Sequence, residues 1–83
     1  MSHNIKSSDF SLMRVFGRYA ARDADLRAYN DAATYILIGT DEERTLLTME
    51  FHEGVRNSAE NQRVVDECMR RLEETVKTME EQK

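Results

Sequence analysis

The sequence contains no proline and no tryptophan, only three glycines and a single cysteine. Without proline, which removes a backbone donor and clashes inside a helix, the chain can form long helices. The lone Cys68 excludes a disulfide framework within the chain. The longest strongly apolar run, 35–38, is far shorter than the roughly 20 residues that cross a bilayer. The N-terminus also lacks the order of a signal peptide, so we expect a cytoplasmic protein without a membrane segment.

The length and the charge of the chain limit its function further. Its 83 residues correspond to one domain with a small core. Apolar residues at 40% and charged residues at 34% are typical of a folded helical protein rather than a disordered one. The net charge is −4, which makes long nucleic acid a poor partner, because phosphate neutralisation dominates such binding. Residues 1–39 carry a slight excess of bases, so a small anionic ligand could bind there.

The C-terminal half carries a charge pattern that repeats every seven residues. One position is always acidic and the position three residues later is always basic: Glu53, Glu60, Glu67, Glu74 and Glu81, then Arg56, Arg63, Arg70 and Lys77. An acid and a base three residues apart are neighbours on a helix surface. The opposite side carries an apolar stripe that includes Phe51, Val55, Val65, Met69, Leu72, Val76 and Met79. The pattern predicts one long amphipathic helix over about 41–81.

The N-terminal half carries a second apolar pattern. Residues 1–7 are mostly polar and are expected to be flexible. Ser8 or Asp9 is a suitable N-cap, because a short side-chain oxygen can accept from a free amide of the first turn. Apolar residues then recur at spacings of three and four as far as Leu37, which predicts a helix over about 8–38.

Each predicted helix has one alternative with an interruption. Gly17 lowers helix stability by roughly 1 kcal/mol relative to Ala, so the first helix could break between Gly17 and Asp23, with Asp23 as the new N-cap. The second helix could end near 54–57 and restart, because Asn57 and Glu60 fit a capping box. The unbroken charge rows favour one continuous helix at this second place.

The two helices are separated by a turn at 39–40. Gly39 follows the last apolar residue, where a left-handed residue often ends a helix, and Thr40 with Glu43 forms a capping box. Helices joined by so short a connection fold back on each other. We therefore predict an all-α fold: an antiparallel helical hairpin with a long C-terminal amphipathic helix.

The hairpin register leads to two further expectations. Positions that sum to about 79 should pair, which places Arg22 and Asp23 opposite Asn57 and Ser58 in a polar layer. This layer would either set the register or form a ligand pocket. The C-terminal end of the long helix would then extend beyond the first helix without an apolar partner. Self-association, or docking to a partner helix, is expected through Val65, Met69, Leu72, Val76 and Met79.

No group of residues in the sequence indicates an enzyme or a cofactor site. His52 and Glu53 resemble the start of a zinc-protease helix, but Arg56 stands where the second histidine is required. His3 lies in the flexible terminus, so we predict no metal site. Cys68 is expected to be a buried, unreactive thiol.

The best candidate for ligand binding is a row of arginines in the first helix. Arg14, Arg18 and Arg22 are four residues apart and share one helix face, with Tyr19 beside Arg18. Guanidinium groups next to an aromatic ring can hold a phosphate and a base together. The alternative is a solvated basic face that balances the acidic second helix.

The start of the second helix resembles a known family. The sequence Glu43-Arg44-Thr45-Leu46, followed by Glu53-Gly54-Val55, resembles the second-helix signature of the small phage anti-CBASS proteins, the helical-hairpin sponges for cyclic oligonucleotides. Phe10 and the pair Leu26-Arg27 lie where that family has an aromatic residue and an aliphatic-Arg pair. Leu12 replaces the family's early stacking tyrosine, so Tyr19 would take that role.

The resemblance implies a function and a set of ligand residues. It implies a homo-oligomer in the host cytoplasm that sequesters cyclic di- or trinucleotides without cleaving them. The implied contacts are Arg14, Arg18, Arg22 and Arg44 for phosphate, with Tyr19 as the stacking ring. The competing hypothesis is a helical adaptor or inhibitor that binds a protein target through its amphipathic C-terminal helix.

Overall fold

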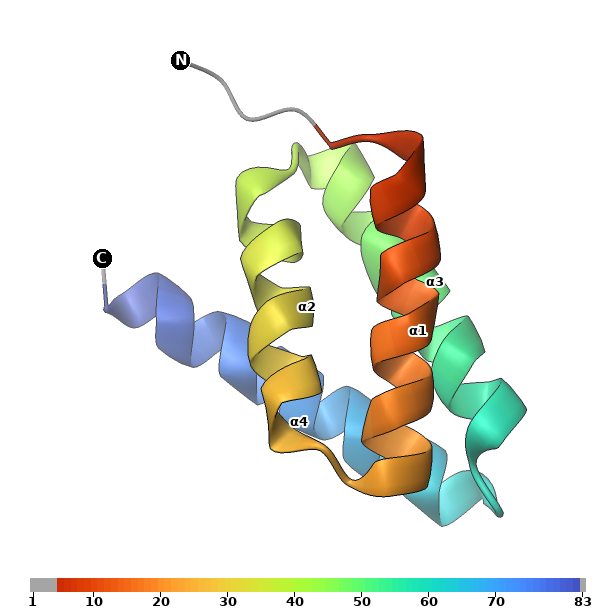
Figure 1. The fold of residues 1–83 in the computed structure, drawn as a ribbon. Helices are drawn as coiled ribbons and strands as arrows, with labels where there is room; N and C mark the ends of the chain where they lie inside the picture. The colour runs from red at the N-terminus through yellow and green to blue at the C-terminus, as the bar shows by residue number, and fades with distance from the viewer. Residues whose placement is uncertain (1–4, 83) are drawn as a thin grey trace.

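The computed structural model describes residues 5–82, which contain four helices and no strand. The helices are α1 (Ser7–Asp23), α2 (Leu26–Ile38), α3 (Asp41–Ser58) and α4 (Gln62–Glu81). The all-α prediction is confirmed. In Figure 1, α1 and α2 lie side by side in opposite directions, α3 runs in the same direction as α1, and α4 crosses the far side of α2. None of the four helices has both the length and the hydropathy that a membrane span needs.

The first predicted helix is interrupted, but further along than 17–23. α1 continues through Gly17 and ends at Asp23, where Ala24 adopts the left-handed conformation with φ 51°. The Asp25 side chain, rather than Asp23, caps α2 by accepting from the Arg27 amide at 3.0 Å. The helix continues through Gly17, which packs directly against the backbone of α3.

The start of α1 also differs from the prediction. The helix begins at Ser7, with Lys6 as the N-cap. Asp9 lies in the first turn, where its carboxylate accepts a hydrogen bond from the Lys6 amide at 2.8 Å. Ile5 packs against the core, so the expected flexibility of 1–7 does not extend to residues 5–7. Residues 1–4 and His3 among them lie outside the described part of the chain.

The predicted helix over 41–81 is two helices. α3 ends at Ser58 and α4 starts at Gln62, with Asn61 accepting from the Val64 amide at 3.2 Å. The prediction of one continuous helix is therefore wrong. The alternative, in which the helix ends near 54–57 and restarts, is closer to the observed end at Ser58. The repeating charges did not indicate the break. Both helices keep their charged faces in solvent, so the seven-residue spacing continues across the connection.

The turn at 39–40 is confirmed. Thr40 caps α3, and its side chain accepts from the Glu43 amide at 3.2 Å while Glu43 accepts from the Thr40 amide at 2.9 Å. Gly39, however, has φ −83°, so it is extended rather than left-handed. A side chain there would crowd Glu43, whose Cβ would be 3.1 Å from an added Cβ.

The closest packing in the molecule is between α1 and α3, at one glycine on each helix. A Cβ on Gly17 would collide with the Phe51 carbonyl oxygen and come within 2.9 Å of the Val55 amide nitrogen. A Cβ on Gly54 would collide with the Arg14 carbonyl oxygen. Each glycine therefore admits the backbone of the other helix, an approach that only a residue without a side chain permits.

This contact overturns the predicted antiparallel register between the first and second halves. Arg14 pairs with Glu50, and Arg18 shares a cavity with Asn57 and Ser58, so the numbers on α1 and α3 rise together. The two helices are parallel because α2 reverses the chain between them. The predicted polar layer that set Arg22 opposite Asn57 does not form.

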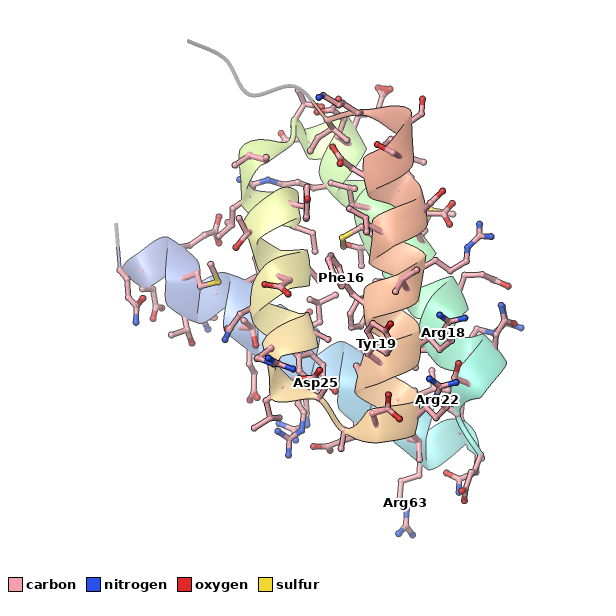
Figure 2. All side chains as sticks on the ribbon, in the orientation of Figure 1. Phe16, Arg18, Tyr19, Arg22, Asp25 and Arg63 are labelled. Atoms are coloured by element: carbon pink, nitrogen blue, oxygen red, sulfur yellow. The ribbon has the colours of Figure 1, made fainter. Side chains whose placement is uncertain are left out.

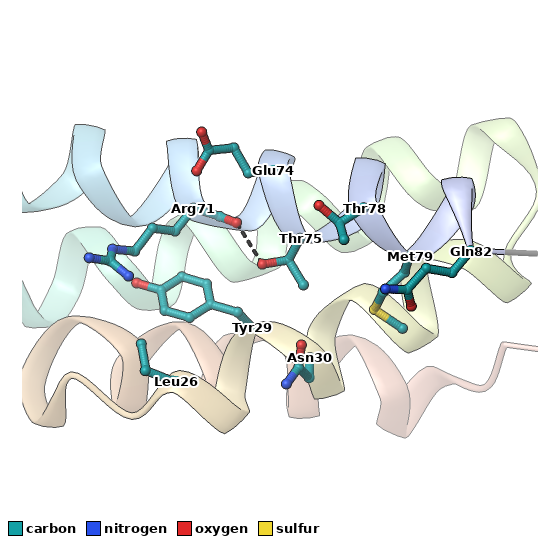
Figure 3. A pocket seen from close by; sticks show the side chains of 9 residues that line it. All are labelled: Leu26, Tyr29, Asn30, Arg71, Glu74, Thr75, Thr78, Met79 and Gln82. Atoms are coloured by element: carbon teal, nitrogen blue, oxygen red, sulfur yellow. Dashed lines mark hydrogen bonds between the residues drawn. The ribbon is translucent and has the colours of Figure 1, made fainter.

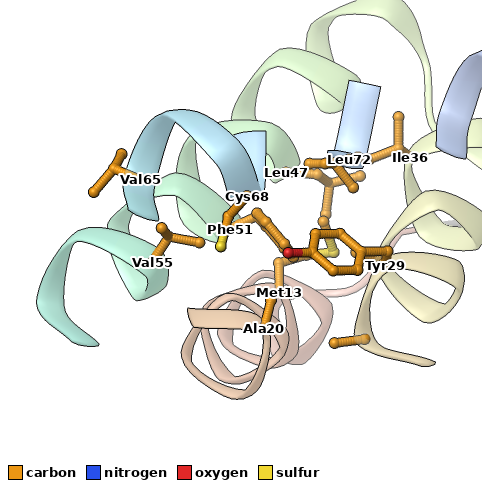
Figure 4. Packing of buried hydrophobic residues seen from close by; sticks show 12 residues of the cluster. Met13, Ala20, Tyr29, Ile36, Leu47, Phe51, Val55, Val65, Cys68 and Leu72 are labelled. Atoms are coloured by element: carbon orange, nitrogen blue, oxygen red, sulfur yellow. The ribbon is translucent and has the colours of Figure 1, made fainter. Parts of the chain in front are cut away.

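The core lies where all four helices meet. Its fully buried side chains are Met13, Leu47, Phe51 and Val55, and the Tyr29 ring lies 6.0 Å from the Phe51 ring (Figure 4). α4 adds Val65, Cys68 and Leu72 to this core, and Val76 packs against it. The expectation that Leu72, Val76 and Met79 have no partner within the chain is therefore wrong, because the break after Ser58 turns α4 back across α2.

Candidate functional site

The structure brings two of the predicted ligand residues into one groove. Arg14 and Arg18 line a cavity of about 190 Å³ between α1 and α3. We call this cavity the α1/α3 groove; its other lining residues are Ser11, Val15, Gly54, Asn57 and Ser58. Gly54 carries no side chain, and the space beside its Cα is filled by the Arg14 backbone. The lining offers guanidinium, hydroxyl and amide donors and contains no carboxylate, which suits an anion.

The two arginines of the groove differ in their partners. The Arg14 Nη2 atom lies 2.6 Å from Glu50 Oε1, and Nε donates to the same oxygen at 3.0 Å. Arg18 makes no ion pair with any residue between 5 and 82. Its guanidinium lies 5.8 Å from the centroid of the Tyr19 ring, within cation–π range. Arg18 is therefore the cation of the groove that a ligand can engage without breaking a salt bridge.

Tyr19 does not line the groove, although its ring lies 5.8 Å from the Arg18 guanidinium. Its side chain is 38% exposed and lines a cavity of about 350 Å³ between α1 and α2, together with Phe16 and Asp25. Figure 2 shows Arg18 and Tyr19 emerging on either side of the same turn of α1. A hydrogen bond from the Arg27 side chain lowers the pKa of Asp25, so this cavity holds a carboxylate, unlike the α1/α3 groove.

The remaining predicted ligand residues lie elsewhere. Arg22 is near the end of α1, on the same side as Arg18 (Figure 2), and pairs with Asp23 at 3.4 Å. Arg44 is remote from the groove: its Nη1 atom is 3.3 Å from Glu80, and its Nη2 atom donates to the Leu37 carbonyl at 3.3 Å. Arg44 therefore links the end of α4 to the end of α2.

The predicted partner-binding residues are mostly part of the chain's own core. Val65 and Leu72 are buried, and Met69 and Val76 pack against the core. Met79 is half-buried beside a cavity between α2 and α4. Met69, Leu72 and Val76 also line an open cavity of about 360 Å³, so part of this stripe can be reached from the surface.

The sequence did not single out the cavity between α2 and α4. It has a volume of about 380 Å³ and is lined by Leu26, Tyr29, Asn30, Arg71, Glu74, Thr75, Thr78, Met79 and Gln82 (Figure 3). Tyr29 appeared in the sequence only as one member of an apolar pattern, and nothing in that pattern predicts the packing of α4 over α2. Burial, followed by the neighbouring Cys68, raises the pKa of the Tyr29 hydroxyl.

With the groove and its neighbours described, the chain can be compared with known proteins. No family model, curated protein or solved structure matches it. The chemistry of the site must therefore be argued from its own residues.

No three histidine, cysteine or acidic side chains of residues 5–82 gather in an arrangement that would hold a metal ion. Cys68, the one cysteine, is buried in the core. The α1/α3 groove offers positive charge and hydrogen-bond donors, and the Tyr19 ring follows Arg18 in the sequence.

Proposed function

We propose that this chain is a non-enzymatic protein that sequesters cyclic oligonucleotides as a homo-oligomer, with the α1/α3 groove as its phosphate site. One observation carries the proposal: an acidic protein of net charge −4 has a groove lined by two guanidinium groups and no carboxylate. Phosphodiesters are recognised by such donors. Cyclic oligonucleotides are also the ligands that the resemblance of the second helix implies.

Within this proposal the residues have separate roles. Arg18 binds the phosphate, supported by the hydroxyl groups of Ser11 and Ser58 and by the Asn57 amide. Arg14, held by Glu50, adds positive charge at the upper end of the groove. At about 190 Å³ the groove accommodates a phosphate and part of a sugar, so the bases extend over the surface toward Tyr19 or onto a second copy.

Binding is tested by thermal unfolding with a panel of probes. The probes are cyclic di-AMP, cyclic di-GMP and a cyclic triadenylate, each compared with its linear counterpart and with inorganic phosphate. A ligand at about 100 times its dissociation constant adds about 2.7 kcal/mol to stability, which raises the Tm of a domain of this size by several degrees. If no cyclic probe raises the Tm, the proposal is wrong.

The site is tested by removing Arg18, with a matched control. Arg18→Gln should weaken binding of the active probe about tenfold or more, because a charged hydrogen bond is lost. Arg63→Gln makes the same change on a side chain that points away from α1 (Figure 2) and should leave the affinity within about twofold. Equal losses in both variants, measured by calorimetric titration, would show that the ligand does not use the groove.

The adaptor hypothesis has less support from the geometry. It assigned partner binding to the apolar stripe of α4, whose Val65 and Leu72 are buried in the chain's own core. The part of the stripe left to a protein partner is the cavity of about 360 Å³ lined by Met69, Leu72 and Val76.

A further inference from the structure

The outer face of α3 carries two exposed apolar side chains one turn apart. Leu46 is 45% exposed and Met49 is 59% exposed, although both belong to a helix whose opposite face forms the centre of the core. Exposed apolar side chains are common singly. Here they lie in a row with charged residues of opposite sign at its two ends, which is unusual.

The row, which we call the α3 stripe, consists of Glu42, Leu46, Met49, Glu53 and Arg56. Its spacings alternate between four and three residues, so the side chains form a straight seam along the helix. Glu42 lies seven residues before Met49, and Arg56 lies seven residues after it. The acid and the base are therefore equally distant from the exposed methionine, about 10 Å along the axis at 1.5 Å per residue.

We propose that the α3 stripe is a self-association surface that binds the α3 stripe of a second copy, antiparallel and about a two-fold axis at Met49. In this arrangement Glu42 meets Arg56 of the partner subunit, and Arg56 meets Glu42 of the partner subunit. Met49 lies on the axis, and Leu46 of each copy lies beside Glu53 of the partner subunit. The contact is isologous, so it closes at two chains.

Charge selects this arrangement over the others. A parallel pair would set Glu42 against the same residue of the partner subunit and Arg56 against its own counterpart, which is repulsive. The antiparallel pair also sets the partial positive charge at the start of each α3 beside the partial negative charge at the end of the other. Arg56 is available, because its pair with Glu53 is long at 3.8 Å and lies at the surface.

The inference places self-association on α3, whereas the sequence indicated α4, whose Val65 and Leu72 are buried in the chain's own core. It rests on the homo-oligomer of the proposed function but not on its ligand, because the α3 stripe and the α1/α3 groove use different residues. The stripe offers only two apolar side chains, so the contact area is below that of a standard interface. We expect exchange between monomer and dimer with a dissociation constant on the order of 10–100 μM.

The test is sedimentation of the full chain, without ligand, from about 5 μM to 1 mM. The wild-type mass should rise from monomer to dimer over this range. Met49→Glu, Glu42→Arg and Arg56→Glu should each remain monomeric, with unchanged helicity by circular dichroism. An equimolar mixture of Glu42→Arg and Arg56→Glu should form dimers again, because both interchain pairs are then restored, and the double variant should dimerise by itself.

Other results would overturn the inference. A wild-type protein that stays monomeric at 1 mM excludes it, and so does a dimer whose mass is unaffected by the three single variants. Failure of the mixture to recover dimers would contradict the antiparallel pairing. A monomeric protein whose Tm still rises with a cyclic probe would leave the groove proposal standing while removing this one, so the two are separable.

Discussion

Tyr29 is the side chain whose chemistry is changed most by folding. It is only 5% exposed, with its ring 6.0 Å from that of Phe51 and its hydroxyl beside Cys68. Burial disfavours the charged phenolate, so the pKa is raised from its ordinary value of 10.0. The folded state therefore holds the phenol proton more tightly than the unfolded state does.

This shift predicts a dependence of stability on alkaline pH. A group with a raised folded pKa contributes its full stability below the unfolded value of about 10 and loses it as the pH rises further. The free energy of unfolding should fall more steeply above pH 10 in the wild type than in Tyr29→Phe. Urea denaturation from pH 8 to 11.5 measures this, with Tyr19→Phe, which removes an exposed hydroxyl, as the control. Parallel curves for wild type and Tyr29→Phe would refute the assignment.

At the scale of elements, the pair of α1 and α3 depends on two residues without side chains. Gly17 admits the Phe51 carbonyl and the Val55 amide, and Gly54 admits the Arg14 carbonyl. Backbone atoms inside helices cannot rotate aside as the end of a flexible side chain can. The spacing between the two helices is therefore set by these glycines.

Gly17→Ala tests this view against helix propensity. Propensity alone predicts that alanine stabilises a helix by about 1 kcal/mol relative to glycine. The structure predicts the opposite sign, a loss of at least about 2 kcal/mol, because α1 and α3 must separate. Gly39→Ala is the control: its φ of −83° suits alanine and its nearest neighbour is a side chain, so a smaller change is expected. Guanidinium denaturation of both variants measures whether the free energy of unfolding rises or falls. A Gly17→Ala variant that is more stable than the wild type would refute the close backbone contact between α1 and α3.

The elements also show what the sequence could and could not predict. Helix content and the turn at Gly39 and Thr40 follow from local spacing and capping, which the sequence contains. The connection at 59–61 could not be predicted from the repeating charges, because these charges reflect only the solvent-exposed face of each helix. The role of Gly17 could not be predicted for a related reason. Its low helix propensity is a local property, whereas the close packing that it allows involves a helix some 35 residues away.

The candidate site likewise combines features that local spacing predicts with features that depend on the packing of distant helices. The four-residue spacing of Arg14 and Arg18 predicts that they share a face, and the structure places both in one groove. The antiparallel register set the other wall, Asn57 and Ser58, opposite Arg22 and Asp23, whereas the parallel packing of α1 and α3 places it in one groove with Arg14 and Arg18. Arg44 lies apart from these arginines and pairs with Glu80, which it reaches because α4 folds back over α2.

At the scale of the whole molecule, α4 folds back over α2. Val65 and Leu72, which the sequence assigned to an interface, are therefore buried in the chain's own core. Leu72 is 2% exposed, within a cluster to which all four helices contribute. Leu72→Ala should therefore lower the free energy of unfolding by about 2–4 kcal/mol, from lost burial and the cavity left behind. Leu26→Ala, at a side chain that is 62% exposed, should change it by less than about 0.5 kcal/mol.

The concentration dependence of that experiment distinguishes a core from an interface. A core residue gives the same loss at 2 μM and at 200 μM protein, because pairing of two chains through α3 would stabilise the wild type and the variant equally. If the effect of Leu72→Ala grew with protein concentration in chemical denaturation, the side chain would act between chains, as the apolar stripe first indicated.

The glycine contact between α1 and α3 also limits how this protein can evolve. A collision between two side chains can be relieved by making one of them smaller, so most packing defects have a second-site suppressor. At Gly17 and Gly54 the obstructing atoms are carbonyl oxygens and an amide nitrogen of the facing backbone, which every amino acid carries. No substitution at the facing residues can make room for a side chain at either glycine, so descendants of this sequence that keep the fold should keep both.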